Sequence, residues 1–217
     1  MRRRTGVATA AVLLCSAVAF AQSPADSPST SPPADGTTAI DASTVVEPGA
    51  TEWMVTAGPA WGIVVFRSSR NHRYMIQTVS WGRILAAPRG PGGLRGRFEW
   101  AVEVAPIYRQ YEPSDTNGLA ITPVVWRWNF EPRGRLAPYG ELAGGGLWTH
   151  DPVPDQTTTA NFTAHAAVGL RVFLRQREAA VVSYRFHHIS NGNRIKQNPG
   201  VNAHMIQVGW VFARAHK

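Results

Sequence analysis

The sequence predicts an all-β protein, an eight-stranded antiparallel transmembrane β-barrel whose lumen is filled by side chains. Three observations predict this fold. An export signal begins the chain, an alternation of period two recurs in segment after segment without a long helical period, and the alternation places aromatic residues on one face and charged residues on the other.

Residues 1–21 are predicted to be a secretory signal peptide. Three arginines precede an apolar run from Gly6 to Phe20, and Ala19-Phe20-Ala21 has the small-x-small pattern of a cleavage site. The alternative, a retained membrane anchor, needs roughly 20 apolar residues, and this run is shorter. Removal of the signal takes away Cys15, the one cysteine of the chain, and excludes disulfide and thiol chemistry from the mature protein.

Residues 22–50 are predicted to form a disordered linker, because Ser, Pro, Thr, Ala and Asp predominate and cannot bury a core. The folded part is then expected to comprise residues 51–217, a size that suits one domain.

Eight segments of this part alternate as strands do, and turn-forming residues separate them. The expected strands are residues 53–66, 73–85, 94–108, 119–130, 136–148, 159–174, 179–190 and 202–212. In the third, one set of positions runs from Phe98 through Trp100 to Tyr108, and the other contains Glu99 and Glu103. One face of the sheet is therefore apolar and aromatic, and the other is charged.

These faces favour a barrel in a membrane over a soluble lipocalin-like barrel or a β-sandwich. An outer-membrane barrel exposes its apolar face to lipid, with aromatic girdles at the interfaces, and a closed sheet leaves no backbone group unpaired in hydrocarbon. Eight strands enclose a lumen just wide enough to be filled, so the inward arginines and glutamates are expected to form a packed ionic plug rather than a pore lining.

The connections predict the orientation. In such barrels both termini lie in the periplasm, and the connections after the odd-numbered strands face outward and are longer. EPSDTNG, HDPVPDQ and NGNRIKQNPG follow the third, fifth and seventh expected strands, whereas EPRGR and RQRE follow the fourth and sixth. APRGPGG, after the second, is longer than this rule predicts.

The seventh expected strand carries polar residues on its apolar face. His188 and Ser190 share that face with Val182, Tyr184 and Phe186. Polar groups facing lipid carry a desolvation cost, yet residues i and i+2 lie roughly 7 Å apart, and histidine can act as the base that activates a serine hydroxyl. The alternative is that both side chains lie at headgroup level without chemistry. The neighbouring His187 is expected to point into the lumen in a structural role.

His188-Ile189-Ser190-Asn191, followed by a loop with Lys196 and Gln197 and a final strand, resembles the outer-membrane lipid A 3-O-deacylases of the PagL type, also called acyloxyacyl hydrolases. The resemblance is specific across residues 188–202. It implies an esterase that removes acyl chains, with the 3-O position expected, from lipid A in the outer leaflet of the cell outer membrane, reached by Sec-dependent export.

The same resemblance assigns roles to residues of the site. It makes His188 the general base and Ser190 the nucleophile, and it gives Asn191, Gly192 and Asn193 the task of stabilising the oxyanion. The family has a glutamate that orients the histidine, and Asn202 stands at the matching position here. An asparagine carbonyl can accept the imidazole N–H but cannot stabilise imidazolium by charge.

Charge indicates an anionic partner. Without the three signal arginines, the basic residues, 22 in the whole chain, still outnumber the 14 acidic residues. Arg194 and Lys196 are candidates to bind the phosphates of lipopolysaccharide, with a solvated loop as the alternative. The histidines have no metal-ligand spacing, so no metal and no cofactor are expected, and no nucleic-acid partner. A closed barrel leaves the oligomeric state open.

Two functions of different classes follow. The first is an outer-membrane esterase that acts on lipid A through an acyl-enzyme on the lipid-facing surface. The second is a non-catalytic small outer-membrane barrel with a structural or binding role. They differ in whether His188 and Ser190 lie together on the lipid side.

Overall fold

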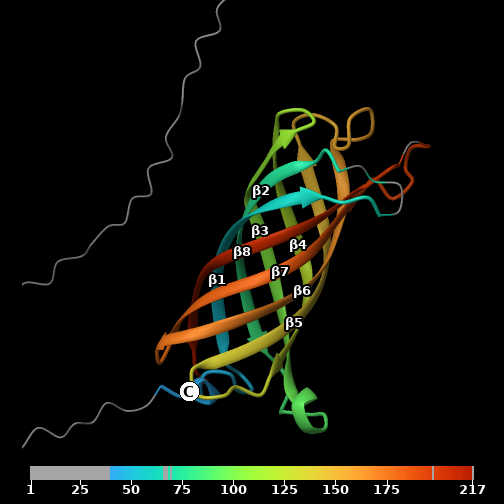
Figure 1. Ribbon diagram of the computed structural model, residues 1–217. Coiled ribbons are helices and arrows are strands. Elements are labelled where there is room, and N and C mark those ends of the chain that lie inside the picture. Colours follow the sequence, from blue (N-terminus) through green and yellow to red (C-terminus); the bar gives the residue numbers. More distant parts are fainter. Residues whose placement is uncertain (1–39, 66–67, 69, 197, 217) are drawn as a thin grey trace, which may run out of the picture. The chain divides into compact units, whose positions relative to one another are not determined.

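The computed structural model describes residues 40–65, 68, 70–196 and 198–216. The signal peptide and residues 22–39 of the expected linker lie outside this range. Eight antiparallel strands form one closed barrel in chain order, in which β8 pairs with β1 (Figure 1). The strands are β1 (Thr51–Gly62), β2 (Arg73–Ile84), β3 (Gly96–Glu112), β4 (Thr116–Phe130), β5 (Leu136–Thr149), β6 (Ala160–Arg175), β7 (Glu178–Ser190) and β8 (Val201–Arg214). The predicted fold and all eight predicted strands are confirmed. Among the described residues, no helix is long and apolar enough to cross a membrane.

The barrel has two different ends. The C-terminus, the N-terminal residues of the described part and the connections 85–95, 131–135 and 176–177 lie at one end, here named the terminal end (Figure 1). The other end, named the loop end, carries the connections 63–72, 113–115, 150–159 and 191–200. The third connection is shorter than predicted, because β3 and β4 extend through most of EPSDTNG and leave only residues 113–115 between them.

The outer face of the barrel is apolar, as the alternation predicts. In β4, Trp126 is exposed while its neighbour Arg127 is buried. One assignment was wrong: Tyr108 was placed on the apolar outer face, yet it is buried in the lumen and Ile107 is exposed instead. The register of β3 against β4 shifts between Ala105 and Tyr108, and such a bulge inserts an extra residue and reverses the alternation beyond it.

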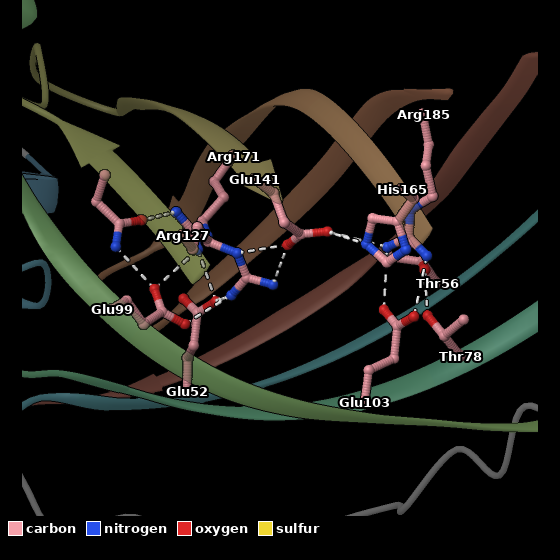
Figure 2. Close-up of polar contacts among 11 residues, drawn as sticks. Glu52, Thr56, Thr78, Glu99, Glu103, Arg127, Glu141, His165, Arg171 and Arg185 are labelled. Atoms are coloured by element: carbon pink, nitrogen blue, oxygen red, sulfur yellow. Dashed lines mark hydrogen bonds and ion pairs between the residues drawn. The ribbon is translucent and has the colours of Figure 1, made fainter. Parts of the chain in front are cut away.

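Charged side chains fill the middle of the lumen (Figure 2). The guanidinium of Arg127 donates to Glu52, Glu99 and Glu141 over 2.6 to 2.9 Å. Further pairs continue the network on both sides: Arg171 with Glu52 and Asn129, Arg185 with Glu103 and Glu141, and His165 with Glu141. The predicted ionic plug is thus a network in which every arginine meets at least one carboxylate.

Apolar clusters lie on both sides of the ionic network. Toward the loop end the cluster includes Tyr74, Tyr108, Leu147, Ile189 and Met205, all with at most 1% exposure. Toward the terminal end the cluster includes Met54, Tyr139, Phe173 and Val211. The lumen is therefore packed along its length, which matches the prediction that it is not a pore lining.

The predicted boundary between linker and barrel needs a correction. Residues 40–50 were assigned to the disordered linker, but they fold over the terminal end of the barrel. Ala42–Thr44 form a 3-10 helix capped by Asp41, and Val45, Val46 and Ala50 are buried in the apolar cluster there. A short stretch with few apolar residues can pack in this way because the barrel supplies the remaining core.

Candidate active site

Strand β7 places His188 and Ser190 on the outer face near the loop end. Both are half-buried, whereas Ile189 between them is fully buried inside the barrel. Val182 and Tyr184 on the same face are exposed. The predicted face of both residues is therefore confirmed by the alternation of β7.

Strand pairing brings Asn202 to His188. The register of β7 against β8 makes the two residues direct cross-strand neighbours, and Nδ1 of His188 lies 2.7 Å from Oδ1 of Asn202. Asn202 is only 1% exposed although its strand position faces outward. The imidazole and the amide thus form a shielded pair on the outside of the sheet.

The connection between β1 and β2 provides this shielding. The N–H of Ile63 donates to the backbone oxygen of Asn202 over 2.8 Å, and Nδ2 of Asn202 donates to the backbone oxygen of Val65 over 2.8 Å. Figure 1 shows the connections β1–β2 and β7–β8 side by side at the loop end. No sequence pattern predicts the role of Val65, which lies 137 residues from Asn202 in the chain.

The Val65 carbonyl determines the tautomer of His188. A carbonyl oxygen only accepts hydrogen bonds, so the NH₂ group of Asn202 faces Val65 and its oxygen faces the imidazole. The Nδ1 atom of His188 therefore carries the proton and donates it to Asn202. In the neutral imidazole this leaves the lone pair on Nε2, the atom with which a general base would act.

Within the described part of the chain, Ser190 has no hydrogen-bond partner, and no hydrogen bond joins it to His188. Both side chains project from one face of β7 at positions i and i+2, roughly 7 Å apart at Cα. Catalytic hydrogen bonds are often long in ligand-free enzymes and shorten when substrate binds. The arrangement combines a hydroxyl without a hydrogen-bond partner in the described residues with an imidazole that Asn202 orients.

The residues expected to stabilise an oxyanion lie in two different places. Asn191 is fully buried, and its backbone N–H donates to Oδ1 of Asn198 over 3.1 Å. Gly192 and Asn193 are exposed and have left-handed backbone angles, with φ of 64° and 60°. Asn198, which the sequence reasoning missed, also donates from Nδ2 to Oδ1 of Asn193 over 3.0 Å and so holds both sides of the turn.

Arg194 and Lys196 differ in their surroundings. Arg194 donates from Nε to the backbone oxygen of Asn191 over 3.0 Å and from Nη2 to the backbone oxygen of Ala160, and its guanidinium lies 5.2 Å from the centre of the Phe162 ring. Lys196 is exposed beside a depression of about 500 Å³. Arg194 thus attaches the β7–β8 turn to β6, whereas the side chain of Lys196 is exposed.

The neighbouring histidines lie outside this site. Nδ1 of His187 is 2.7 Å from the Tyr74 hydroxyl inside the lumen, and His204 pairs with the Tyr184 hydroxyl on the outer face. The lumen position of His187 agrees with its expected structural role. In the described ranges, no group of three or more His, Cys, Asp or Glu side chains is arranged to hold a metal ion.

Comparisons with known proteins identify the family of the chain and show similar barrels. The family model described as lipid A 3-O-deacylase (PagL) matches residues 90–211. Among solved structures, the crystal structure of the outer membrane enzyme PagL is similar with a TM-score of 0.53 and 14% identity, over 72% of this chain and 97% of that one. The crystal structure of Neisserial surface protein A is similar with a TM-score of 0.53 and 14% identity, over 76% of this chain and 98% of that one. No curated protein matches the chain.

Proposed function

Because the chain belongs to the lipid A 3-O-deacylase (PagL) family, we propose that it is an outer-membrane esterase that removes the 3-O-linked acyl chain of lipid A. The loop end of the barrel then lies in the outer leaflet, where the long connections of such barrels are found. The predicted signal peptide directs the protein to this membrane by Sec-dependent export. The observation that carries the proposal is the hydrogen bond of 2.7 Å between His188 and Asn202 on the outer face, beside Ser190.

In the proposed first step, Nε2 of His188 takes the proton of the Ser190 hydroxyl while the oxygen attacks the ester carbonyl carbon. The bond between that carbon and the sugar oxygen then breaks, and His188 returns the proton to the leaving sugar hydroxyl. The acyl chain remains on Ser190. In the second step, His188 deprotonates a water molecule that attacks the acyl-enzyme, releasing the fatty acid and the free serine.

The turn after Ser190 is proposed to stabilise the oxyanion. Gly192 and Asn193 have consecutive positive φ angles of 64° and 60°, and the backbone N–H groups of this turn are the proposed donors. Preorganised donors of this kind stabilise developing charge strongly where water is excluded. Asn191 is proposed to belong to the same oxyanion-stabilising turn. Its backbone N–H donates to Oδ1 of Asn198, which holds the turn in place.

Substrate phosphate is proposed to bind at the loop end beside this turn. Lys196 is exposed there, and Arg194 carries a guanidinium next to the exposed ring of Phe162. Both cations follow Ser190 within a few residues, so the headgroup would lie outward of the reacting ester. Lipid A or the lipopolysaccharide of the outer leaflet is the proposed partner.

A non-catalytic barrel is the second candidate function. Two observations favour it: within the described residues Ser190 and His188 are not hydrogen-bonded, and the third member of the site is the amide Asn202 instead of an acid. In this case the protein would have the barrel fold and the packed lumen of the family but would not cleave esters.

An assay of fatty-acid release separates the two functions. We expect purified wild-type protein in bilayers that contain lipid A to release fatty acid, and Ser190→Ala and His188→Ala to release none. The two single variants and the double variant should behave alike, because members of one catalytic unit are not additive. The buried residue Ser183 on the same strand provides the control Ser183→Ala. Folded wild-type protein without release would favour the non-catalytic barrel.

A further inference from the structure

Positive charge is concentrated at the terminal end of the barrel. Among the described residues, the exposed arginines of this end are Arg83, Arg89, Arg95, Arg133, Arg135, Arg175, Arg177 and Arg214, and the exposed or half-buried carboxylates there are Asp41, Glu47, Glu131 and Glu178. At the loop end, the exposed cations Arg70, Arg73, Arg194 and Lys196 are balanced by the exposed carboxylates Glu112, Asp115, Asp151 and Asp155. The excess positive charge of the described part therefore lies at the end opposite to the candidate active site.

The longest connection of the barrel, residues 85–95 between β2 and β3, belongs to this basic end (Figure 1). It contains a short 3-10 helix, η2 (Gly92–Leu94). Trp128 on the outer face of β4 donates from Nε1 to the backbone oxygen of Leu94 over 3.1 Å. The connection that exceeds the length expected for this end is thus attached to the outer wall of the barrel.

A depression of about 430 Å³ lies between this connection and the outer wall. Its floor consists of the outward, apolar residues Phe130, Leu136, Pro138 and Leu170 of β4, β5 and β6, and its margin consists of Gly92, Gly93, Glu131 and Arg133. Phe130 ends β4 and Leu136 begins β5, so the depression lies where the apolar wall meets the basic end. We name this depression the terminal-end site.

The margin of the terminal-end site carries a cation that has no partner in the described part of the chain. Oε1 of Glu131 lies 3.5 Å from Nε of Arg95 and 3.3 Å from Nη1 of Arg97, so this carboxylate already faces two guanidinium groups. Arg133 is exposed, and its side chain forms no ion pair or hydrogen bond within the described residues. A guanidinium binds a phosphate group through paired, charge-assisted hydrogen bonds.

The apolar floor and the cationic margin together fit an amphiphile with an anionic headgroup. Both termini of such barrels lie in the periplasm, so the terminal end lies in the leaflet of phospholipids and not in that of lipopolysaccharide. A free phosphate ion would gain nothing from the apolar floor. A zwitterionic phospholipid would bring its ammonium group close to the surrounding arginines, whereas basic clusters at a membrane surface attract anionic lipids.

We propose that the terminal-end site binds one anionic phospholipid of the periplasmic leaflet, with the phosphate at Arg133 and one acyl chain over the apolar floor. The long β2–β3 connection then forms the outer wall of a lipid-binding site. The proposal does not depend on ester cleavage, because no residue of the terminal-end site belongs to the candidate active site on β7 and β8.

Native mass spectrometry of the folded protein in a neutral detergent tests this proposal. The protein is titrated with dioleoyl phosphatidylglycerol and, separately, with dioleoyl phosphatidylcholine, and the fraction that carries one bound lipid gives the affinity. We expect the wild-type protein to bind phosphatidylglycerol roughly tenfold more tightly than phosphatidylcholine. Arg133→Gln should lower the affinity for phosphatidylglycerol by roughly tenfold, because it removes a charge-assisted contact with the phosphate.

Arg177→Gln is the matched control. Arg177 is also exposed at the terminal end and has no ion pair within the described residues, but it does not line the terminal-end site. We expect this variant to bind phosphatidylglycerol as the wild type does. Gly93→Glu is a second test variant, since a Cβ atom at Gly93 has no neighbour within 4 Å and the added carboxylate would repel the phosphate from the margin.

Four results would overturn the terminal-end site: equal affinity of the wild type for the two lipids, equal loss in Arg133→Gln and Arg177→Gln, wild-type affinity in Gly93→Glu, or binding of glycerol 3-phosphate as tight as that of phosphatidylglycerol. Equal loss in the two arginine variants would assign the binding to the general charge of this end. Tight binding of glycerol 3-phosphate would mean that the apolar floor contributes nothing.

Discussion

At the scale of single residues, the amide of Asn202 can orient His188 because the Val65 carbonyl orients the amide. In serine proteases, exchange of the acid for its amide lowers turnover by about 10⁴, largely through the wrong histidine tautomer. Here the NH₂ group of Asn202 is occupied by Val65, so it cannot turn toward the imidazole and impose that tautomer. What the amide still lacks is the negative charge that stabilises imidazolium.

We predict that Asn202→Ala lowers kcat roughly ten- to a hundredfold with little change in KM, which corresponds to the loss of one hydrogen bond of about 1–3 kcal/mol. The measurement is steady-state release of fatty acid from lipid A in mixed micelles. His204→Ala is the control, because His204 lies two residues further on the same face and pairs with Tyr184 instead. Unchanged kcat in Asn202→Ala would remove Asn202 from the mechanism.

Part of this site could be predicted from the sequence, since period-two alternation determines the faces of His188 and Ser190, and the family motif aligns Asn202. Val65 and Asn198 could not be found in this way. The contact of Val65 with Asn202 depends on a loop that crosses the β1–β8 boundary, and the contact of Asn198 with Asn191 depends on how the β7–β8 connection closes. Neither residue has a chemical type that marks it as functional.

At the scale of elements, the connection β7–β8 depends on a glycine beside the nucleophile. Gly192 has a φ of 64°, and a Cβ atom there would lie 2.8 Å from the ring of Phe162. The left-handed conformation costs a non-glycine residue about 1 kcal/mol. Any substitution at this position therefore shifts the turn that carries the proposed oxyanion donors.

We predict that Gly192→Ala lowers kcat for lipid A by roughly 10²-fold, as expected when an oxyanion donor is displaced. Gly134→Ala is the matched control: Gly134 also has a positive φ, 55°, but lies in a turn at the terminal end with nothing near its Cβ position. Both variants share the cost of a positive φ in urea denaturation, Gly192→Ala also has the contact with Phe162 to relieve, and only Gly192→Ala should lose activity. Equal kcat in the two variants would contradict the role of the turn.

The strands themselves could be predicted because alternation and turn residues are local signals. Their ends were less predictable, since β3 and β4 continue through polar residues whose backbone groups pair with each other beyond the apolar stretch. The reversed face of Tyr108 has a similar cause. A bulge depends on the partner strand, and alternation along one strand contains no information about it.

At the scale of the whole molecule, stability depends on the ionic network in the lumen. Arg127 is 1% exposed and contacts the carboxylates of Glu52, Glu99 and Glu141. Removal of one partner from a buried ionic group leaves uncompensated charge, which typically costs 3–5 kcal/mol. The network should therefore matter for the fold, while the site on the outer face depends on it only indirectly.

We predict that Arg127→Met destabilises the barrel by about 3–5 kcal/mol, measured as a lower urea midpoint for the loss of the heat-modifiable folded band on gels. Arg175→Met is the control, because Arg175 forms an exposed ion pair with Glu178 and such pairs contribute at most about 1 kcal/mol. Equal midpoints for the two variants would mean that the lumen network does not stabilise the barrel.

The filled lumen could be predicted from strand number and inward charges, but the pairing of those charges could not. Arg127 and Glu52 are 75 residues apart in sequence and meet only because the barrel closes. The packing of residues 40–50 over the terminal end was also missed. These residues have a linker-like composition, and the apolar surface against which Val45 and Val46 pack belongs to distant strands.

The most direct test of the esterase is mass spectrometry of lipid A from cells that produce either the wild-type protein or Ser190→Ala at equal levels in the outer membrane. We expect lipid A from the wild-type cells to lose one ester-linked acyl chain, assigned by fragmentation to the 3-O position, and lipid A from the Ser190→Ala cells to keep it. Identical lipid A in the two strains, with both barrels folded, would contradict a deacylase that uses Ser190 as its nucleophile.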